Sequence, residues 1–453
     1  GSAHYTLTSA AMPYTDVTGS PLIEGETKSW TGKVLPYGEM HLYRVRAAPG
    51  VAAMDIRLKN TVGKPYLFVE KAATGVFRLP GVEMPDHEYE VALSQDPKNS
   101  GYERDFAHPS LITVPAPSGD YWVLVTNEYQ DDPQLEGGYD LEIEGKATPD
   151  LPFNGGSIEV TVDDPQPANT WRYYKVVVPA NAVGWDLRLE NVTSGLPEMV
   201  IARTDFPVKP PPFTTTSGLA SATSWAANQQ WATGKDFPSD NNDLDEEMVG
   251  RYFTVGMNAP LSAGTYIVGV SNRLFIPGPT GSDNMAYTIE SRGIGEAPQL
   301  DANGNPWLIP VHPLGFSGGS VSGSLGVRKI AAYSVDIPAA TASWEVKLEP
   351  TPGHEAMMAI GKDRLPRSDA LQTYNSVSVV NGTIREKTGN DYFYRFHATT
   401  DGGIEVGRFY ILVVGEGQSP ADDEHTGTGT VDYTLTSRPL PLPAAPYVAG
   451  TIP

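Results

Sequence analysis

The 453-residue sequence contains no cysteine, which excludes disulfide bridges, thiol nucleophiles and zinc–thiolate sites. It has no apolar run near the roughly 18 residues of a membrane-spanning helix. Only 32 Lys and Arg face 54 Asp and Glu, without the basic cluster that binds a nucleic-acid backbone. We therefore expect neither nucleic acid nor a membrane span. The net charge of −22 suits a soluble extracellular protein and could also hold divalent cations.

The residues that are abundant favour strands and turns. The 46 glycines and 40 prolines indicate many turns and little long helix. Valine, tyrosine, threonine and isoleucine dominate the apolar runs, as is typical of half-buried strands. The chain is too long for one ordinary core. We predict an all-β protein with about three domains.

One pattern occurs three times. In each occurrence a tyrosine stands 11 residues before the first residue of a strand-like segment. The segments are MDIRLKN, WDLRLEN and WEVKLEP, and the pairs of residues are Tyr43 and Met54, Tyr174 and Trp185, and Tyr333 and Trp344. The repetition predicts a tandem array of one module.

The residues of the WDLRLEN segment alternate in character, as they do in a strand. Trp185, Leu187 and Leu189 share one face, whereas Asp186 and its polar neighbours share the other. One face is then expected to pack inward and the other to meet water, which is the pattern of antiparallel sheets stacked in pairs. The aromatic residue that opens the segment is expected to anchor the core.

The array is predicted to be three tandem antiparallel, jelly-roll-like β-sandwich modules in an elongated arrangement. Proline-rich joins place module 1 at 14–147, module 2 at 148–295 and module 3 at 296–440, followed by a proline-rich linker at 441–453. Residues 1–13 are expected to be the closing strand of a preceding module and a linker, because HYTLTS there nearly repeats DYTLTS near the other end.

Four ordered elements recur in these modules. They are Tyr-x-Val in a strand that ends at proline, the W-x-L/V-x-L strand, Gly-x-Tyr/Phe before the penultimate strand, and a closing Tyr-Thr-Leu. Over nearly all of residues 14–438 they resemble the bacterial pre-peptidase C-terminal (PPC) domain, a β-sandwich module found after secreted peptidases. The aspartate-rich turn of that family is poorly kept, for example at Gly195-Leu196-Pro197.

The resemblance implies an accessory role outside the bacterial cell or on its surface. It implies calcium-stabilised folding and, in some members, binding to collagen or polysaccharide. No calcium site of the family can be assigned to particular residues of this chain.

No catalytic constellation is evident. Gly315-Phe316-Ser317-Gly318-Gly319 fits the G-x-S-x-G pattern of serine hydrolases, but no helix follows it, so we expect a flexible loop. His87-Glu88 and His354-Glu355 each lack the second histidine of a zincin helix. The chain itself is predicted not to be an enzyme, although a larger parent protein could carry a peptidase or another hydrolase.

Several acidic loops could bind calcium. The candidate ligands are Asp301, Asn303 and Asn305 in one loop, Asp240, Asp243 and Asp245 in a second, and Asp131, Asp132, Asp422 and Asp423 in loops before a closing strand. Oxygen ligands at alternate positions are typical of calcium loops. The alternatives are an ordinary β-turn for the first loop and solvated acidic loops for the others.

An aromatic insertion in module 2 contains Trp225 and Trp231. Exposed tryptophans could stack on sugar rings, whereas the same residues could cover an edge of the sandwich. The leading functional prediction is a non-catalytic spacer or adhesive region of a large secreted or cell-surface bacterial protein. The alternative is a carbohydrate- or matrix-binding module appended to a secreted hydrolase.

Overall fold

The structure, a computed structural model, describes most of the chain. The described residues are 13–36, 38–63, 65–72, 111–127, 137–167, 170–192, 197–203, 206, 230–233, 251–255, 261–272, 284–326, 329–365, 383–388, 391–397, 404–418 and 429–440. They form strands β1 to β25 and contain no helix. The all-β prediction is therefore confirmed. For reference, residues 14–147, 148–295 and 296–440 are called repeats 1, 2 and 3.

Repeat 1 forms two sheets with the orders β1-β3-β7-β5 and β2-β8-β4-β6. The strands are β1 (Tyr14–Asp16), β2 (Thr27–Leu35), β3 (Met40–Ala47), β4 (Ala53–Val62), β5 (Pro65–Lys71), β6 (Leu111–Pro115), β7 (Gly119–Asn127) and β8 (Gly137–Lys146). All pairs are antiparallel except β1 with β3, which is parallel.

Repeat 2 forms one sheet with the order β10-β15-β12-β13 and a second run of strands with the order β14-β11-β16, in which β9 also pairs with β16. Its strands are β9 (Gly156–Val160), β10 (Thr170–Val178), β11 (Gly184–Glu190), β12 (Pro197–Arg203), β13 (Gln230–Thr233), β14 (Arg251–Val255), β15 (Gly264–Asn272) and β16 (Tyr287–Glu296).

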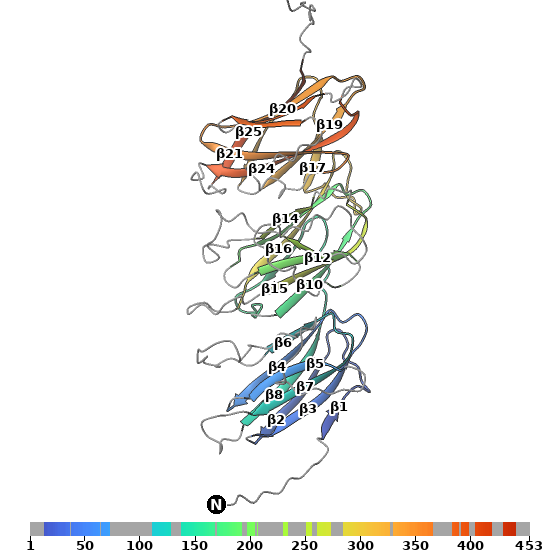
Figure 1. Cartoon of the computed structure of the whole chain (residues 1–453), viewed down its shortest axis with the longest axis vertical. Coiled ribbons are helices and arrows are strands. Elements are labelled where there is room, and N and C mark those ends of the chain that lie inside the picture. The colour runs from blue at the N-terminus through green and yellow to red at the C-terminus, as the bar shows by residue number, and fades with distance from the viewer. Residues whose placement is uncertain are drawn as a thin grey trace, which may run out of the picture.

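Repeat 3 forms a run of strands β17-β19-β24-β21 and a sheet with the order β18-β25-β20-β23-β22. Its strands are β17 (Ile309–Pro313), β18 (Gly319–Gly326), β19 (Ile330–Ile337), β20 (Ser343–Pro350), β21 (His354–Lys362), β22 (Thr383–Thr388), β23 (Asp391–His397), β24 (Gly407–Gln418) and β25 (Thr430–Pro439). Figure 1 shows the three repeats one after another along the long axis of the molecule.

The recurrent strand lies at the centre of each repeat and supplies its core anchor. Trp185 and Trp344 are buried, and so is Met54 at the matching position of repeat 1. A second anchor joins the two sheets of each repeat across the core, where two tyrosine hydroxyls meet. The hydroxyl oxygens are 2.9 Å apart in Tyr43 and Tyr139, 2.8 Å in Tyr174 and Tyr287, and 2.7 Å in Tyr333 and Tyr433.

The expectation that the polar face of the recurrent strand meets water is wrong for its first charged positions. Asp186 and Arg188 are completely or almost completely buried, and Asp55 and Glu345 are also buried. Alternation correctly places these side chains on the face opposite the core. They are buried nevertheless because each acid lies beside cationic side chains that shield it, and a charge can be buried when it is paired.

Candidate functional site: the joints between repeats and the buried acids

Repeats 2 and 3 are joined by a continuous sheet. The short strand β17 pairs in parallel with β16 of repeat 2, where Ile294 lies opposite Ile309. On its other side, β17 pairs in parallel with β19, where Val311 lies opposite Ala332. The result is an eight-stranded sheet that runs through both repeats. Bending at this joint would have to break backbone hydrogen bonds between β17 and its two neighbours.

An indole is packed tightly into the same joint. Trp307, two residues before β17, is 5% exposed and belongs to the core of repeat 2. A Cβ atom at Gly295 would lie 2.0 Å from Trp307 Cε2, and one at Gly293 would lie 3.0 Å from Trp307 Cζ3. The two glycines are therefore needed for the close approach of the indole to β16.

Charged side chains reinforce the joint. Arg408 on β24 forms ion pairs with Glu296 of β16 at 2.7 Å and with Asp336 of β19 at 2.8 Å. The Tyr410 hydroxyl donates to the Glu296 carboxylate at 2.8 Å. Burial and this hydrogen bond raise the pKa of Tyr410 to about 12, whereas the hydrogen bond from Arg408 lowers the pKa of Asp336. Lys329 adds a fourth contact, 2.7 Å from Glu190 of repeat 2.

The candidate calcium loop at Asp301 forms a turn at this joint. Asp301 Oδ1 accepts hydrogen bonds from the backbone N–H groups of Asn303 at 2.9 Å and Asn305 at 2.8 Å. Asp301 Oδ2 accepts from the Asn154 side chain of repeat 2 at 3.0 Å. Burial alone would raise the pKa of Asp301, but the hydrogen bonds from Asn154, Asn305 and Asn303 outweigh it and lower that pKa. The loop thus has the turn geometry that its sequence also allowed.

Asn154 connects repeat 2 to this turn. Besides Asp301, its Nδ2 donates to the carbonyl oxygen of Pro306 at 2.9 Å, and its Oδ1 accepts from the Leu308 N–H at 3.0 Å. One side chain therefore holds the connecting segment at three points. Its isolated position in LPFNGG gave no sequence signal for this role.

Repeats 1 and 2 meet differently. Ala52 and Ala53 of repeat 1 pack against a small apolar cluster on repeat 2 that contains Trp171, Tyr173 and Ile267. The rings of Trp171 and Tyr173 stack with centroids 5.7 Å apart. Among the described strands, no sheet crosses this joint. Within the described residues this contact is mainly apolar, and a hydrogen bond from the Thr148 N–H to Glu24 at 2.8 Å lies beside it.

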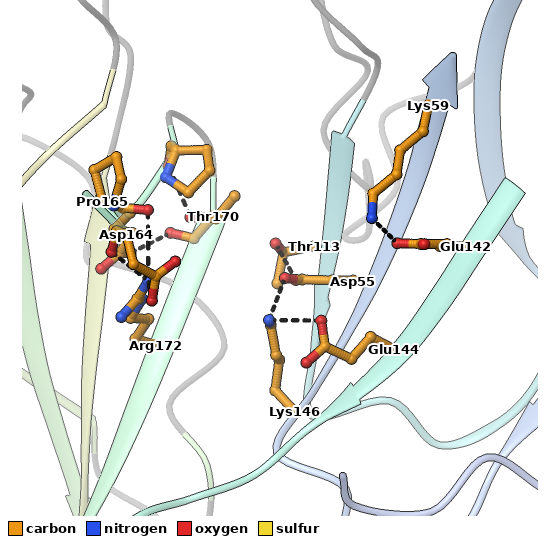
Figure 2. Close-up of polar contacts among 12 residues, drawn as sticks. Asp55, Lys59, Thr113, Glu142, Glu144, Lys146, Asp164, Pro165, Thr170 and Arg172 are labelled. Atoms are coloured by element: carbon orange, nitrogen blue, oxygen red, sulfur yellow. Dashed lines mark hydrogen bonds and ion pairs between the residues drawn. The ribbon is translucent and has the colours of Figure 1, made fainter. Parts of the chain in front are cut away.

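A buried acid on the outer sheet face is the second recurrent polar feature. In repeat 1, Asp55 accepts a hydrogen bond from Thr113 at 2.6 Å and forms an ion pair with Lys146 at 3.3 Å. Lys146 also reaches Glu144 at 2.8 Å, so one lysine bridges two carboxylates, as Figure 2 shows. Burial raises the pKa of Asp55, and Lys146 and Thr113 only partly oppose this effect.

Other polar contacts flank this group in Figure 2. Lys59 pairs with Glu142 on the same sheet face. On repeat 2, Arg172 donates to the backbone carbonyl of Asp164 at 3.2 Å, and the Thr170 hydroxyl donates to Pro167 at 2.7 Å. These bonds hold the start of β10 against the segment that precedes it.

The equivalent acids of repeats 2 and 3 have arginine partners. Asp186 lies between Arg188 and Arg292, and Arg188 Nε donates to its two oxygens at 2.9 and 3.0 Å. Glu345 accepts from Arg438 Nη2 at 2.6 Å, and that arginine is 62% exposed. All three acids are bound by cations or hydroxyl groups of the same face, which is an arrangement that stabilises a sheet.

Most predicted metal ligands cannot be placed. Asp131, Asp132, Asp240, Asp243, Asp245, Asp422 and Asp423 lie outside the described residues. Within the described part of the chain, no three His, Asp or Glu side chains are grouped as a metal ion would require. Calcium binding by these loops stays a prediction.

The predicted sugar platform also falls largely outside the described residues. Trp225 does so entirely. The backbone of Trp231 lies in β13 opposite Ile201 of β12, but its side chain is not among the described ones. Ligand binding by this pair stays a prediction.

The G-x-S-x-G segment forms a tight turn. The Gly319 N–H donates to the Gly315 carbonyl at 3.1 Å, and Gly318 has a positive φ of 76°. A strand, β18, follows, so the strand-to-helix elbow of a serine hydrolase is absent from this segment. The segment is therefore a turn with no helix after it, as predicted, whereas its flexibility stays a prediction. His354 begins strand β21.

Comparisons with known proteins add no family. A scan with models of protein families gives no match, and neither does a search of curated proteins. Among solved structures, the crystal structure of tripeptidyl peptidase 2 (TPP II) aligns with 92% of this chain at 9% identity and a TM-score of 0.18. The chain spans 37% of that protein's chain. Within the described residues, no helix is long and apolar enough to cross a membrane.

Proposed function

We propose that this chain is a rigid, non-catalytic spacer or adhesive region of a larger secreted or cell-surface protein. The observation that carries the proposal is the eight-stranded sheet, which continues from β16 of repeat 2 through β17 to β19 of repeat 3. A spacer has to keep a distance, and backbone pairing across a joint resists bending better than a flexible linker does. The elongated arrangement in Figure 1 fits the same role.

The contacts described above also support a structural role. Each buried acid is bound by a cation of its own sheet face, and each tyrosine pair links the two sheets of its repeat. Arg408 connects repeat 3 to Glu296 of repeat 2. The alternative function given above is binding to a polysaccharide or a matrix protein. That function would depend on surfaces such as the aromatic insertion of repeat 2. Calcium would add stiffness by neutralising the acidic loops.

The proposal is tested by measuring the angle between repeats directly. The chain contains no cysteine, so two introduced cysteines are the only sites for thiol-reactive spin labels. Val162 and Val406 are 70% and 54% exposed on repeats 2 and 3, and Val62 is 59% exposed on repeat 1. We expect a narrow distance distribution between labels at 162 and 406, and a broader one between labels at 62 and 162.

A variant at the joint sharpens this test. Asn154→Ala removes three hydrogen bonds from the connecting segment and should broaden the 162–406 distribution while the 62–162 distribution stays the same. Asn303→Ala is the matched control, because Asn303 bonds to Asp301 through its backbone. A 162–406 distribution as broad as the 62–162 one, or with several maxima, would rule out a rigid spacer.

A further inference from the structure

Strand β18 is an edge strand without the usual protection. Exposed edges attract other strands, and proteins protect them with charges, prolines, bulges or short length. β18, with the sequence GSVSGSLG, has eight residues, no charge and no proline. It pairs with β25 without a register shift, from Gly319 opposite Ser437 to Gly326 opposite Thr430. Among the described strands, none pairs with its other side.

The matching strands of the other repeats are protected. β2 also pairs with the closing strand of its repeat, but it carries Lys28 and Lys33 and has a register shift between Trp30 and Lys33. β9 has only five residues and includes Glu159. The other described edge strands are short, charged, bulged or contain proline. Strand β18 of repeat 3 thus lacks the protection that β2 and β9 have.

The backbone of β18 is accessible. Ser320, Ser322 and Ser324 are exposed along one face of the sheet. On the sheet itself, an open depression of about 440 Å³ is lined by residues 322–324 together with residues of β25 and β20. The small side chains of the three serines leave room for another strand to approach. Gly323 is held as glycine by packing, since a Cβ atom there would lie 2.5 Å from the Tyr433 hydroxyl.

The strand is also complementary to itself. If two copies pair antiparallel about Gly323, Ser322 of each lies opposite Ser324 of the other. In the same register Val321 lies opposite Leu325, so apolar side chains meet on one face and hydroxyls on the other. No charged side chains of β18 face each other, which matters for a chain with a net charge of −22. A two-fold interface requires this self-complementarity.

We propose that β18 is a dimerisation edge, at which a second copy of this chain adds its own β18 in antiparallel register about Gly323. The two five-stranded sheets of repeat 3 then become one sheet that runs through both copies. This inference goes beyond the spacer role and does not depend on it, because it joins two chains side by side. An extended peptide of another protein could use the same edge, but it would not require the similarity of residues 321 and 322 to residues 325 and 324 on the two sides of Gly323.

Charge variants at the exposed serines test both the edge and the register. Ser322→Lys with Ser324→Lys places lysine opposite lysine twice, and the two glutamate substitutions do the same with acids. For each variant alone, sedimentation equilibrium should give a dimer dissociation constant at least about tenfold higher than that of the unmodified chain. An equimolar mixture of the two should recover the dimer. Ser322→Lys combined with Ser324→Glu in one chain should dimerise by itself, because lysine then faces glutamate.

Thr27→Lys with Ser29→Lys on β2 is the matched control and should leave the dimer unchanged, since that edge is already protected. Circular dichroism shows whether each variant is folded. Raising the salt concentration should tighten the unmodified dimer, because salt screens repulsion between two acidic chains. A chain that stays monomeric over a wide concentration range would overturn the proposal. Lysine and glutamate variants that fail to associate when mixed would overturn it as well.

Discussion

Repeats 1 and 2 have different residues at the same two core positions, a polar pair in repeat 2 and an apolar pair in repeat 1. In repeat 2, the Trp185 indole donates to the Ser291 hydroxyl at 2.8 Å, and this hydroxyl donates to the Phe153 carbonyl at 2.8 Å. By strand register, repeat 1 has Met54 and Ile143 at the two positions, neither of which has a hydrogen-bonding group that needs a partner. In each repeat the two side chains leave no hydrogen-bonding group of the pair without a partner. This indicates that the residue at one position depends on the residue at the other.

The outer face shows the same difference. Register places Arg292 opposite Asp186 in repeat 2, but Glu144 opposite Asp55 in repeat 1. Repeat 1 thus sets acid against acid, and Lys146, two residues further along, bridges them. Asp186 has two arginines, whereas Asp55 shares one partly exposed lysine. The cross-strand group, and not the single residue, is therefore the unit that stabilises each face.

The largest expected effect comes from removing the acid that two arginines share. Asp186→Ala leaves Arg188 buried beside Arg292 without their common anion, and breaking a buried pair in this way costs about 3–5 kcal/mol. Glu345→Ala is the comparison, and it should cost less because Arg438 can turn into solvent. Equilibrium urea unfolding measures both. Equal losses in the two variants would show that the burial of the arginines does not matter.

A smaller effect is expected for the Trp185–Ser291 pair. Ser291→Ala leaves the indole N–H buried without its acceptor, which costs roughly 1–3 kcal/mol. Trp185→Met combined with Ser291→Ile installs the residues of repeat 1, and the double variant should be more stable than the sum of the two single losses predicts. A double-mutant cycle by urea unfolding measures this coupling. Strictly additive losses would contradict the idea that the residue at one position depends on the residue at the other.

The smallest effect is expected from the raised pKa of Asp55. Between its ordinary value of 3.8 and this raised pKa, the native protein binds more protons at Asp55 than the unfolded chain does. The contribution of Asp55 to stability is therefore fully present below pH 3.8 and falls as the pH rises through the raised pKa.

Asp55→Asn removes this titration. The unfolding free energy of the unmodified chain minus that of the variant should decrease as the pH rises through the same window. Asp164→Asn is the control, because the Asp164 side chain is 88% exposed. A difference that increases with pH would show that the partners of Asp55 outweigh its burial.

The sequence by itself determined the all-β class and located the recurrent core strand with its anchor. Trp185, Trp344 and Met54 open core strands as their spacing predicts, because alternation along a strand is a local property. It also indicated that Asp301 could form a turn. It did not identify Asn154, Glu296 or Arg408, whose roles depend on partners more than 100 residues away.

Only the tertiary structure decided how the repeats are joined and which polar groups are buried. Nothing local in Ile309–Pro313 shows that it pairs with strands on both sides, and so joins two repeats into one sheet. Likewise, the sequence shows that Asp186 is a charged residue, but not that Arg188 and Arg292 cover it and so allow it to be buried. The physical reason is the same in both cases. A pattern along one strand sets which way a side chain points, whereas pairing between distant segments sets what it meets there.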